Sequence, residues 1–261
     1  MNLILTSCLD LYTKNENGER IAHNFGNENG ILDLIKKLTP KQVNFVFVAS
    51  VESNYDATDI YANVTFDSFK LTFPFDNYIV LDGRTKDNAK EIIRNADLIF
   101  LCGGHVPTQN KFFEEINLRG VIKDSKALII GASAGSMNSA KIVYAQPELE
   151  GEALDPNYRK YVNGLGLTNI SILPHFEEGQ DFILDGKNIM KEISLPDSKI
   201  WPFIAYQDGA YIHDNGSSQI MYGKAYLFEK GKLKQITEEN SVTDITKLTQ
   251  RKFNCNNFKM V

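Results

Sequence analysis

Residues 127–136 read Ala-Leu-Ile-Ile-Gly-Ala-Ser-Ala-Gly-Ser and place a Gly-x-Ser-x-Gly motif directly after an apolar run. A small-residue segment compatible with a helix, residues 137–143, follows the motif. This order predicts a buried strand, a sharp turn that carries Ser133, and then a helix, which is the context of a nucleophile elbow. We expect the backbones of the strand and the helix to approach closely at Gly131 and Gly135, where a side chain would collide with them.

The composition is ordinary for a soluble globular protein, with 43% hydrophobic and 23% charged residues. The 261 residues are enough for a sizeable core, and no internal repeat or low-complexity linker divides them, so we predict a single domain over residues 1–261. The formal charge of −5 argues against nucleic acid or an anionic membrane surface as the main partner.

The N-terminus and the cysteines indicate a cytoplasmic protein. Residues 1–8 have no basic region and only a short apolar run, which predicts a strand and not a signal peptide. No window approaches the ~18 apolar residues that a membrane helix needs. The three cysteines, Cys8, Cys102 and Cys255, are odd in number, far apart and without a C-x-x-C motif, so we expect reduced thiols and no metal site.

The first half of the chain alternates short apolar runs with helical patterns. Continuous apolar runs predict buried strands at residues 3–7, 43–49, 78–81, 98–102 and 127–130. Apolar residues at helical spacing predict helices at residues 31–38, 56–69 and 89–96 and another that begins near Thr108. Repeated β-α units imply right-handed crossovers, and therefore a three-layer α/β/α sandwich with a mostly parallel sheet.

The second half changes character. Residues 148–161 are acidic and polar and predict a loop, residues 169–173 predict a strand that ends at Pro174, and residues 182–193 predict a helix. Turn signals at Asn215-Gly216 and Lys230-Gly231 then predict C-terminal hairpins. Their strands are expected at residues 203–206, 210–213, 219–222, 225–228 and 233–236.

A serine nucleophile needs a base within hydrogen-bond reach, and the chain has four histidines. His175 follows the end of a predicted strand, as Ser133 does, and functional groups gather at the carboxyl ends of strands in open α/β sheets. We therefore predict that His175 is the base. His213 lies inside a predicted hairpin strand and fits a half-buried sheet residue better, and His23 lies in a segment without a clear pattern.

The pair Gly103-Gly104 ends another predicted strand. Two glycines allow the backbone to approach a ligand and to direct N–H groups at it. Together with the N–H group of Ala134, directly after the nucleophile, they form a candidate oxyanion hole. His105 lies beside the glycines, where it could touch a substrate, although a plain strand-to-helix turn would also explain this stretch.

The base needs a carboxylate to orient it, and the sequence offers two candidates. Asp208 follows a predicted strand and precedes a glycine, which places it at an edge of the sheet. Glu148 lies fifteen residues after Ser133. We favour Asp208, while an aspartate before glycine is also common in simple turns.

In order along the chain, these pieces are strand-Gly-Gly, strand-Gly-x-Ser-Ala-Gly, strand-Pro-His, and an acidic residue before glycine. Over about residues 1–230 this pattern resembles peptidase family S51, which includes aspartyl dipeptidase (peptidase E) and cyanophycinase on a class I glutamine amidotransferase-like fold. The order Ser, His, acid differs from that of α/β-hydrolases, which place the acid before the histidine. The resemblance implies that Ser133 is the nucleophile, His175 the base and Asp208 the third member, at a place where the family more often has glutamate.

The resemblance also implies a serine-type exo- or dipeptidase that cleaves short peptides through an acyl-enzyme, with no metal ion or organic cofactor. The cytoplasmic chain is expected to be a monomer or homodimer without nucleic-acid or membrane partners. Two other hypotheses stay open on the sequence alone. One is an amidotransferase-like hydrolase of a non-peptide amide or ester, and the other is a catalytically silent binding protein on the same fold.

Overall fold

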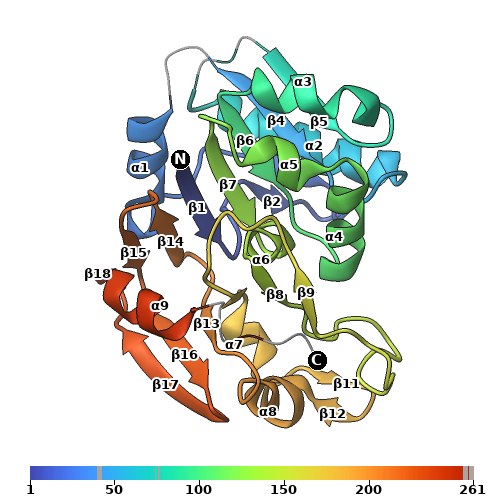
Figure 1. Ribbon diagram of the computed structural model, residues 1–261. Helices are drawn as coiled ribbons and strands as arrows, with labels where there is room; N and C mark the ends of the chain where they lie inside the picture. The colour runs from blue at the N-terminus through green and yellow to red at the C-terminus, as the bar shows by residue number, and fades with distance from the viewer. Residues whose placement is uncertain (40–42, 74, 76, 255–257, 259–261) are drawn as a thin grey trace.

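The computed structural model describes residues 1–39, 43–73, 75, 77–254 and 258, and an eight-stranded sheet runs through it (Figure 1). The strand order is β18-β15-β14-β1-β7-β6-β4-β5, and the strands from β1 to β5 in this order are parallel. The other three continue the sheet in antiparallel pairs. The bounds are β1 Asn2–Thr6, β4 Asn44–Val48, β5 Asn77–Leu81, β6 Leu98–Leu101, β7 Leu128–Ala132, β14 Tyr211–Asp214, β15 Gln219–Tyr222 and β18 Val242–Asp244.

This arrangement confirms the predicted mixed α/β fold with a large, mostly parallel central sheet. Four of the five parallel strands, β1, β4, β6 and β7, are buried because helices pack on both faces of the sheet, and β5 at the sheet edge is partly exposed. None of the helices within the described residues has the length and apolar character needed to cross a membrane.

Alternate side chains of the strands point to opposite faces, and each face has its own core. Leu5, Val48 and Leu101 belong to the first core. It also contains buried residues of α3 (Ala89–Arg94), α4 (Val106–Glu115), α5 (Leu118–Ile122) and α6 (Ala134–Asn138). Ile4 and Phe100 belong to the second core, with buried residues of α1 (Ile31–Leu38) and α2 (Tyr55–Lys70).

A second sheet, in the lower half of Figure 1, has the order β10-β13-β16-β17. Its first two strands are parallel and the others antiparallel. Smaller antiparallel pairs are β2–β3, β8–β9 and β11–β12. The bounds are β2 Tyr12–Lys14, β3 Arg20–Ala22, β8 Ile142–Tyr144, β9 Tyr161–Asn163, β10 Ile172–Leu173, β11 Ile183–Leu184, β12 Lys187–Asn188, β13 Phe203–Tyr206, β16 Ala225–Glu229 and β17 Lys232–Thr237.

Short helical segments complete the chain. A 3-10 turn, Glu28–Gly30, precedes α1, and another, Lys86–Asn88, precedes α3. In the second half, α7 (Phe176–Gly179) follows β10, a π-helix follows β12, and α9 follows β18. The remaining bounds are Ile189–Ser194 for the π-helix, α8 Leu195–Asp197 and α9 Thr246–Lys252.

Two predicted helices are wrong in part. The helix after the Ser133 motif ends at Asn138, and Ile142–Tyr144 forms β8 because its β-branched and aromatic side chains pair with β9. The helix predicted over 182–193 begins only at Ile189, because Asp185 and Gly186 have positive φ angles of 52° and 77° and turn β11 into β12.

Close backbone approach explains the two glycines of the motif, as predicted. A Cβ atom at Gly135 would overlap the carbonyl oxygen of Leu101 in β6. A Cβ atom at Gly131 would lie 2.7 Å from the backbone nitrogen of Ser136 in α6. Strand β6, strand β7 and helix α6 therefore meet with no room for a side chain at either glycine.

This contact predicts that Gly135→Ala lowers the free energy of unfolding by about 3 kcal/mol, because the methyl group forces two backbones apart. Gly18→Ala is the control, since Gly18 has open space around it and only its φ of 79° opposes a side chain. That control should lose about 1 kcal/mol. Urea unfolding measures both, and equal losses would contradict the close-approach argument.

Candidate active site

Ser133 lies at the turn between β7 and α6 in a backbone conformation rare for a residue with a side chain. Its φ is 50° and its ψ is −116°. The Ser133 N–H donates to the carbonyl of Thr6 at 3.1 Å, and the Met137 N–H donates to the Ser133 carbonyl at 3.0 Å. These bonds fix the turn between the sheet and the helix, as a nucleophile elbow requires.

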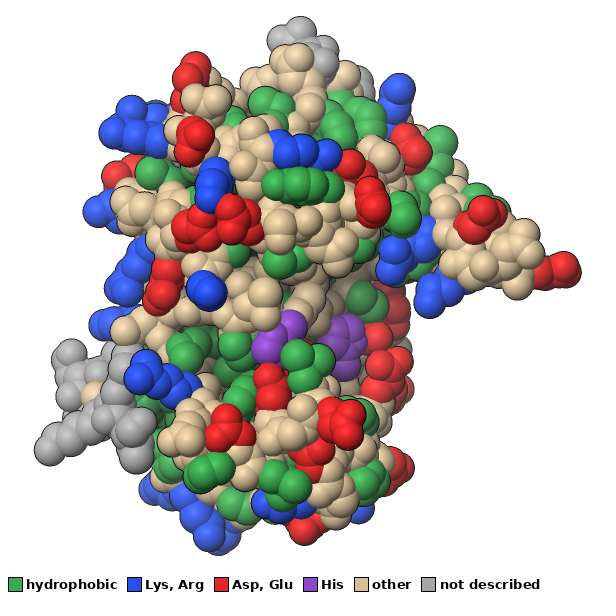
Figure 2. Space-filling view, turned by 90° about the vertical axis from the view of Figure 1, so that its right-hand side faces the viewer, with side chains coloured by type: hydrophobic (Ala, Val, Ile, Leu, Met, Phe, Trp, Pro, Cys, Tyr) green, Lys and Arg blue, Asp and Glu red, His purple; other side chains and the backbone are tan. Residues whose placement is uncertain are grey.

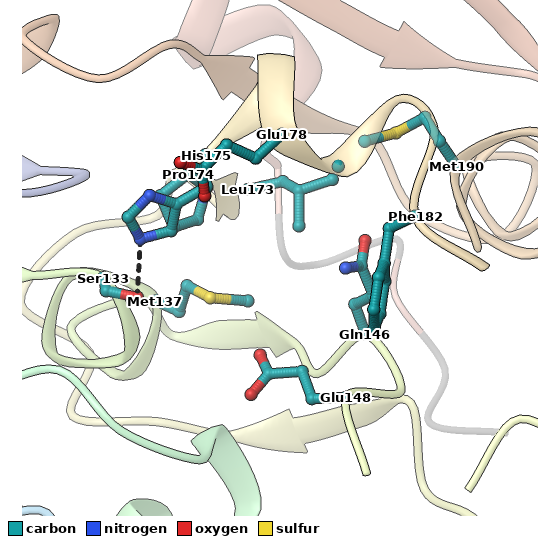
Figure 3. A pocket seen from close by; sticks show the side chains of 11 residues that line it. Ser133, Met137, Gln146, Glu148, Leu173, Pro174, His175, Glu178, Phe182 and Met190 are labelled. Atoms are coloured by element: carbon teal, nitrogen blue, oxygen red, sulfur yellow. Dashed lines mark hydrogen bonds between the residues drawn. The ribbon is translucent and has the colours of Figure 1, made fainter. Parts of the chain in front are cut away.

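His175 directly follows β10 and Pro174, also with a left-handed backbone (φ 56°, ψ 39°). Its Nε2 atom lies 3.0 Å from Ser133 Oγ, the contact drawn in Figure 3. Its backbone N–H donates to Ser7 Oγ at 3.3 Å, which ties the turn to the end of β1. The ring therefore reaches Ser133 from the second sheet.

Asp208 lies in the turn between β13 and β14, and its Oδ1 atom is 2.8 Å from His175 Nδ1. The structure thus places Asp208, and not Glu148, beside the second ring nitrogen. The Nδ1 atom has no acceptor in hydrogen-bond alignment among the described residues, so the pair is close but not linear. The next residue, Gly209, has a φ of 79°, and its carbonyl accepts from Asn29 Nδ2 at 2.9 Å.

A cavity of about 320 Å³ opens beside the serine and the histidine. In Figure 2 two histidine patches lie in a hollow midway along this face, with acidic side chains below them. The volume is at the small end of the range for ligand sites. The cavity is lined by Ser133, Met137, Gln146, Glu148, Leu173, Pro174, His175, Glu178, Gly179, Phe182 and Met190 (Figure 3).

The sequence of the chain matches one known protein family over most of its length. The sequence model of peptidase family S51 matches residues 17–221. The chain belongs to peptidase family S51. It is therefore a peptidase, and the family supports a serine nucleophile. No curated protein sequence matches the chain.

Two solved structures share the fold of this S51 peptidase. A peptidase from an acI-B1 Actinobacterium superposes with a TM-score of 0.62 at 14% identity, over 93% of this chain and 96% of the other. A putative peptidase E protein from Listeria monocytogenes EGD-e gives a TM-score of 0.53 at 17% identity, over 90% of this chain and 98% of the other.

Burial and nearby negative charges have opposite effects on the pKa of His175. Burial lowers the pKa of His175, but contact with Asp208 and the negative charges of Glu178 and Glu148 outweigh it and hold the pKa above its ordinary value. Burial raises the pKa of Asp208, and the contact with His175 outweighs this and keeps the carboxyl ionised. Contact with Asp208 therefore stabilises the protonated form of the His175 ring relative to an isolated imidazole.

Glu148 sits in the cavity and is hard to ionise. Burial and the nearby charge of Glu152 raise its pKa to about 7, although His175 opposes the shift. The acidic loop that carries it is tied down by Glu152, whose Oε2 atom accepts from the N–H groups of Glu148 and Leu149 at 2.9 and 3.0 Å. Asp185 accepts from the Gly151 N–H of the same loop at 2.9 Å. The loop therefore holds its carboxyl groups at fixed positions.

Two of the three predicted oxyanion-hole residues, Gly103 and Ala134, lie beside Ser133. A Cβ atom at Gly103 would come 3.3 Å from Ser133 Cβ, so this glycine touches the nucleophile. Gly104 has a φ of 155°, and a Cβ atom there would collide with Ser50. Ala134 is the first residue of α6, where an N–H group has no partner within the helix.

The other histidines have partners of their own. His105 Nδ1 lies 2.7 Å from Thr108 Oγ1 and Nε2 lies 3.0 Å from Glu152, and the residue does not line the cavity. Its part in substrate binding stays a prediction. His213 Nε2 lies 3.1 Å from Asn2 Oδ1. Within the described ranges, no three His, Cys, Asp or Glu side chains form a group that could hold a metal ion.

Several residues of the site were not found from the sequence. Ser7 lies at the carboxyl end of β1, and the strand-end rule that selected His175 would have selected it too. Gln146, Phe182 and Met190 come to the cavity on loops or after a hairpin, and no local pattern marks them. Of the cysteines, Cys8 and Cys102 are free thiols, and Cys255 lies outside the described residues.

The raised pKa of Glu148 predicts a pH-dependent stability effect. A carboxyl with a higher pKa in the folded than in the unfolded chain costs stability as the pH rises from about 4.5 through about 7. Glu148→Gln should therefore make the S51 peptidase more stable at pH 8, on the order of 1–2 kcal/mol for a partly exposed group, with a gain that shrinks towards pH 4.5. Denaturant unfolding across this range measures the gain.

The matched control is Glu16→Gln, which changes an exposed glutamate in the turn between β2 and β3. It should show no gain that grows with pH. A Glu148→Gln gain that is constant from pH 4.5 to pH 8 would show that ionisation of this carboxyl does not burden the fold.

Proposed function

We propose that this chain is a serine-type exo- or dipeptidase that hydrolyses short peptides through a Ser133-His175-Asp208 triad and an acyl-enzyme. The observation that carries the proposal is the pair of contacts at 3.0 and 2.8 Å that link the three side chains beside a small cavity. The limited volume of that cavity favours short substrates over folded proteins.

In the proposed mechanism, His175 Nε2 accepts the proton of the Ser133 hydroxyl while Oγ attacks the peptide carbonyl carbon. The imidazolium then gives this proton to the leaving amine, and the C–N bond breaks to leave an ester on Ser133. Water attacks that ester with His175 again as the base. The bond between the carbonyl carbon and Ser133 Oγ then breaks, His175 returns its proton to Oγ, and the carboxylate product leaves.

Asp208 supports the base in this scheme without accepting its proton. A carboxylate beside Nδ1 keeps the proton on that nitrogen, so that Nε2 faces Ser133 with a lone pair. The contact is short but not linear in the free protein. Catalytic hydrogen bonds commonly align only when substrate is bound.

The developing oxyanion would be held by backbone N–H groups at Gly103, Gly104 and Ala134. Gly103 lies against Ser133 and Ala134 begins α6, and this nearness to the nucleophile supports the assignment. Fixed backbone donors suit this task because they need no reorganisation as charge develops.

The domain organisation and the cellular location of the chain are part of the same proposal. We treat residues 1–261 as one peptidase domain, a three-layer α/β/α sandwich of the class I glutamine amidotransferase-like type with C-terminal hairpins. Helices in both cores of the sheet and the antiparallel pairs β14–β15 and β16–β17 support this. We place the enzyme in the cytoplasm on its cysteine pattern, as a monomer or homodimer that needs neither nucleic acid nor membrane.

Ser133→Ala should lower peptide hydrolysis about 10³-fold or more, because the acyl-enzyme cannot form. Stability should change little, since one half-buried hydroxyl at a turn contributes little to folding. A panel of dipeptides and short peptides measures the activity, and a fluorophosphonate probe followed by peptide mapping should label Ser133 only in the unsubstituted chain. Residual activity within tenfold would remove Ser133 from the mechanism.

The same panel separates the alternatives. Turnover of amides or esters without turnover of peptides would favour an amidotransferase-like hydrolase. No turnover and no labelling would favour a binding protein on the same fold. Digestion of casein would contradict the restriction to short peptides.

Asp208→Asn should lower kcat about 10²- to 10⁴-fold, because the amide allows the wrong tautomer of His175. Because the carboxylate helps to raise the pKa of His175, its loss should move the acid limb of kcat/KM to lower pH. Asp208→Glu restores the carboxylate and should retain substantial activity. Rate profiles between pH 5 and pH 9 measure all three proteins.

A merely structural role for Asp208 predicts a different pattern. Both variants would then lose activity together with stability, and the acid limb would stay where it is. An Asp208→Asn enzyme with wild-type rates and an unchanged limb would exclude this residue as the third member.

A further inference from the structure

The charge of the cavity walls is the feature that the proposed mechanism does not use. Two glutamates, Glu148 and Glu178, line the cavity, and no lysine or arginine is among its described lining residues. In Figure 3, Glu148 projects into the cavity from below, while the Glu178 carboxyl lies on the His175 side. A substrate in this cavity therefore meets two glutamates with no lysine or arginine beside them.

The Glu148 carboxyl has no hydrogen-bond or ion-pair partner within the part of the chain that the structure describes. Its backbone N–H donates to Glu152 Oε2, and the charge of His175 opposes only part of the rise in its pKa. It is half-buried and held on a loop that Asp185 fixes from the other side. A carboxylate in such surroundings is poorly solvated, and it gains most from a partner of opposite charge.

The rest of the cavity fits a cation on an aliphatic stem. Met137, Leu173, Phe182 and Met190 give apolar walls, and Figure 3 places Phe182 and Gln146 opposite Ser133. Long basic side chains bury their methylene groups along apolar surface and keep the charged end at a polar group. An acidic substrate group would instead be repelled by both glutamates.

Resting on the proposed peptidase function, we propose that this cavity selects short peptides by a positively charged nitrogen, bound by the Glu148 carboxylate. Glu178 adds negative charge on the His175 side of the same cavity. The positive nitrogen has two possible sources in a short peptide, which are a lysine- or arginine-type side chain and the free amino terminus. The amino terminus and lysine present an ammonium group and arginine presents a guanidinium group, and each is a positively charged donor from which Glu148 can accept a hydrogen bond.

Matched peptides test the proposal. Dipeptides and tripeptides carry lysine, norleucine or glutamate on either side of the scissile bond, each with a free or an acetylated amino terminus. We expect kcat/KM to be at least about tenfold higher when the positive nitrogen is present than in the uncharged match, and lowest for glutamate. Preference that follows lysine identifies the side chain as the source, and preference lost on acetylation identifies the amino terminus.

The role of Glu148 is tested by the ratio of kcat/KM for a positively charged peptide to kcat/KM for its uncharged match. Changes that affect both peptides equally cancel in this ratio. Glu148→Gln should bring this ratio close to one. Glu150→Gln, on an exposed residue of the same loop that does not line the cavity, should leave the ratio unchanged. Rates that neither the change from lysine to norleucine nor acetylation of the amino terminus alters would overturn the proposal. So would a preference for glutamate, or a ratio that Glu148→Gln does not alter.

Binding to Ser133→Ala keeps this test separate from the proposed function. This variant cannot form the acyl-enzyme, so calorimetry gives the affinities of the same peptides directly. Tighter binding of the positively charged peptides without any turnover by the unsubstituted chain would leave the charge selection standing and remove the peptidase mechanism. Turnover without charge preference in rate or affinity would do the reverse.

Discussion

The close approach of three backbones around Ser133 is the constraint on which the site depends. Gly135 lies on the Leu101 carbonyl of β6, and Gly131 lies on the backbone of Ser136 in α6. This contact leaves the chain between them only a tight path, and Ser133 takes a positive φ of 50°. Such a conformation costs about 1–3 kcal/mol. Burial of the apolar side chains of β6 and β7 on both faces of the sheet offsets this cost.

The other two side chains reach Ser133 through the register of a second sheet. Strands β10 and β13 are parallel, with Leu173 opposite Ala205, so the chain leaves both strands at the same edge. His175 follows two residues after the first strand's end, and Asp208 follows two residues after the end of β13, so the two side chains meet there. Ser7 at the end of β1 joins this edge to the central sheet.

The sequence predicts those parts of the fold that local patterns control. Five parallel strands and helix α1 lie within about a residue or two of their expected bounds, because continuous apolar runs and a single apolar stripe allow little else. Ser133, His175 and Asp208 share one signal, a position just after a strand. The strand β8 and the β11–β12 hairpin were missed because short pairs depend on a partner elsewhere in the chain, although Asp185-Gly186 is itself a hairpin signal.

The cavity walls could not be predicted in the same way, since Gln146 and Phe182 meet only through loop packing.

Two glutamates that line the cavity, Glu148 and Glu178, link the charge of the substrate to the pKa of His175. Glu148 and Glu178 both raise the pKa of His175, so in the free protein they help to hold a proton that the mechanism must remove. A positively charged nitrogen bound at Glu148 would offset part of this negative field and lower the pKa of His175 once substrate is in place. The Glu148 carboxyl, which is costly to ionise in this cavity, would then prepare His175 to act as the base when a positively charged substrate binds.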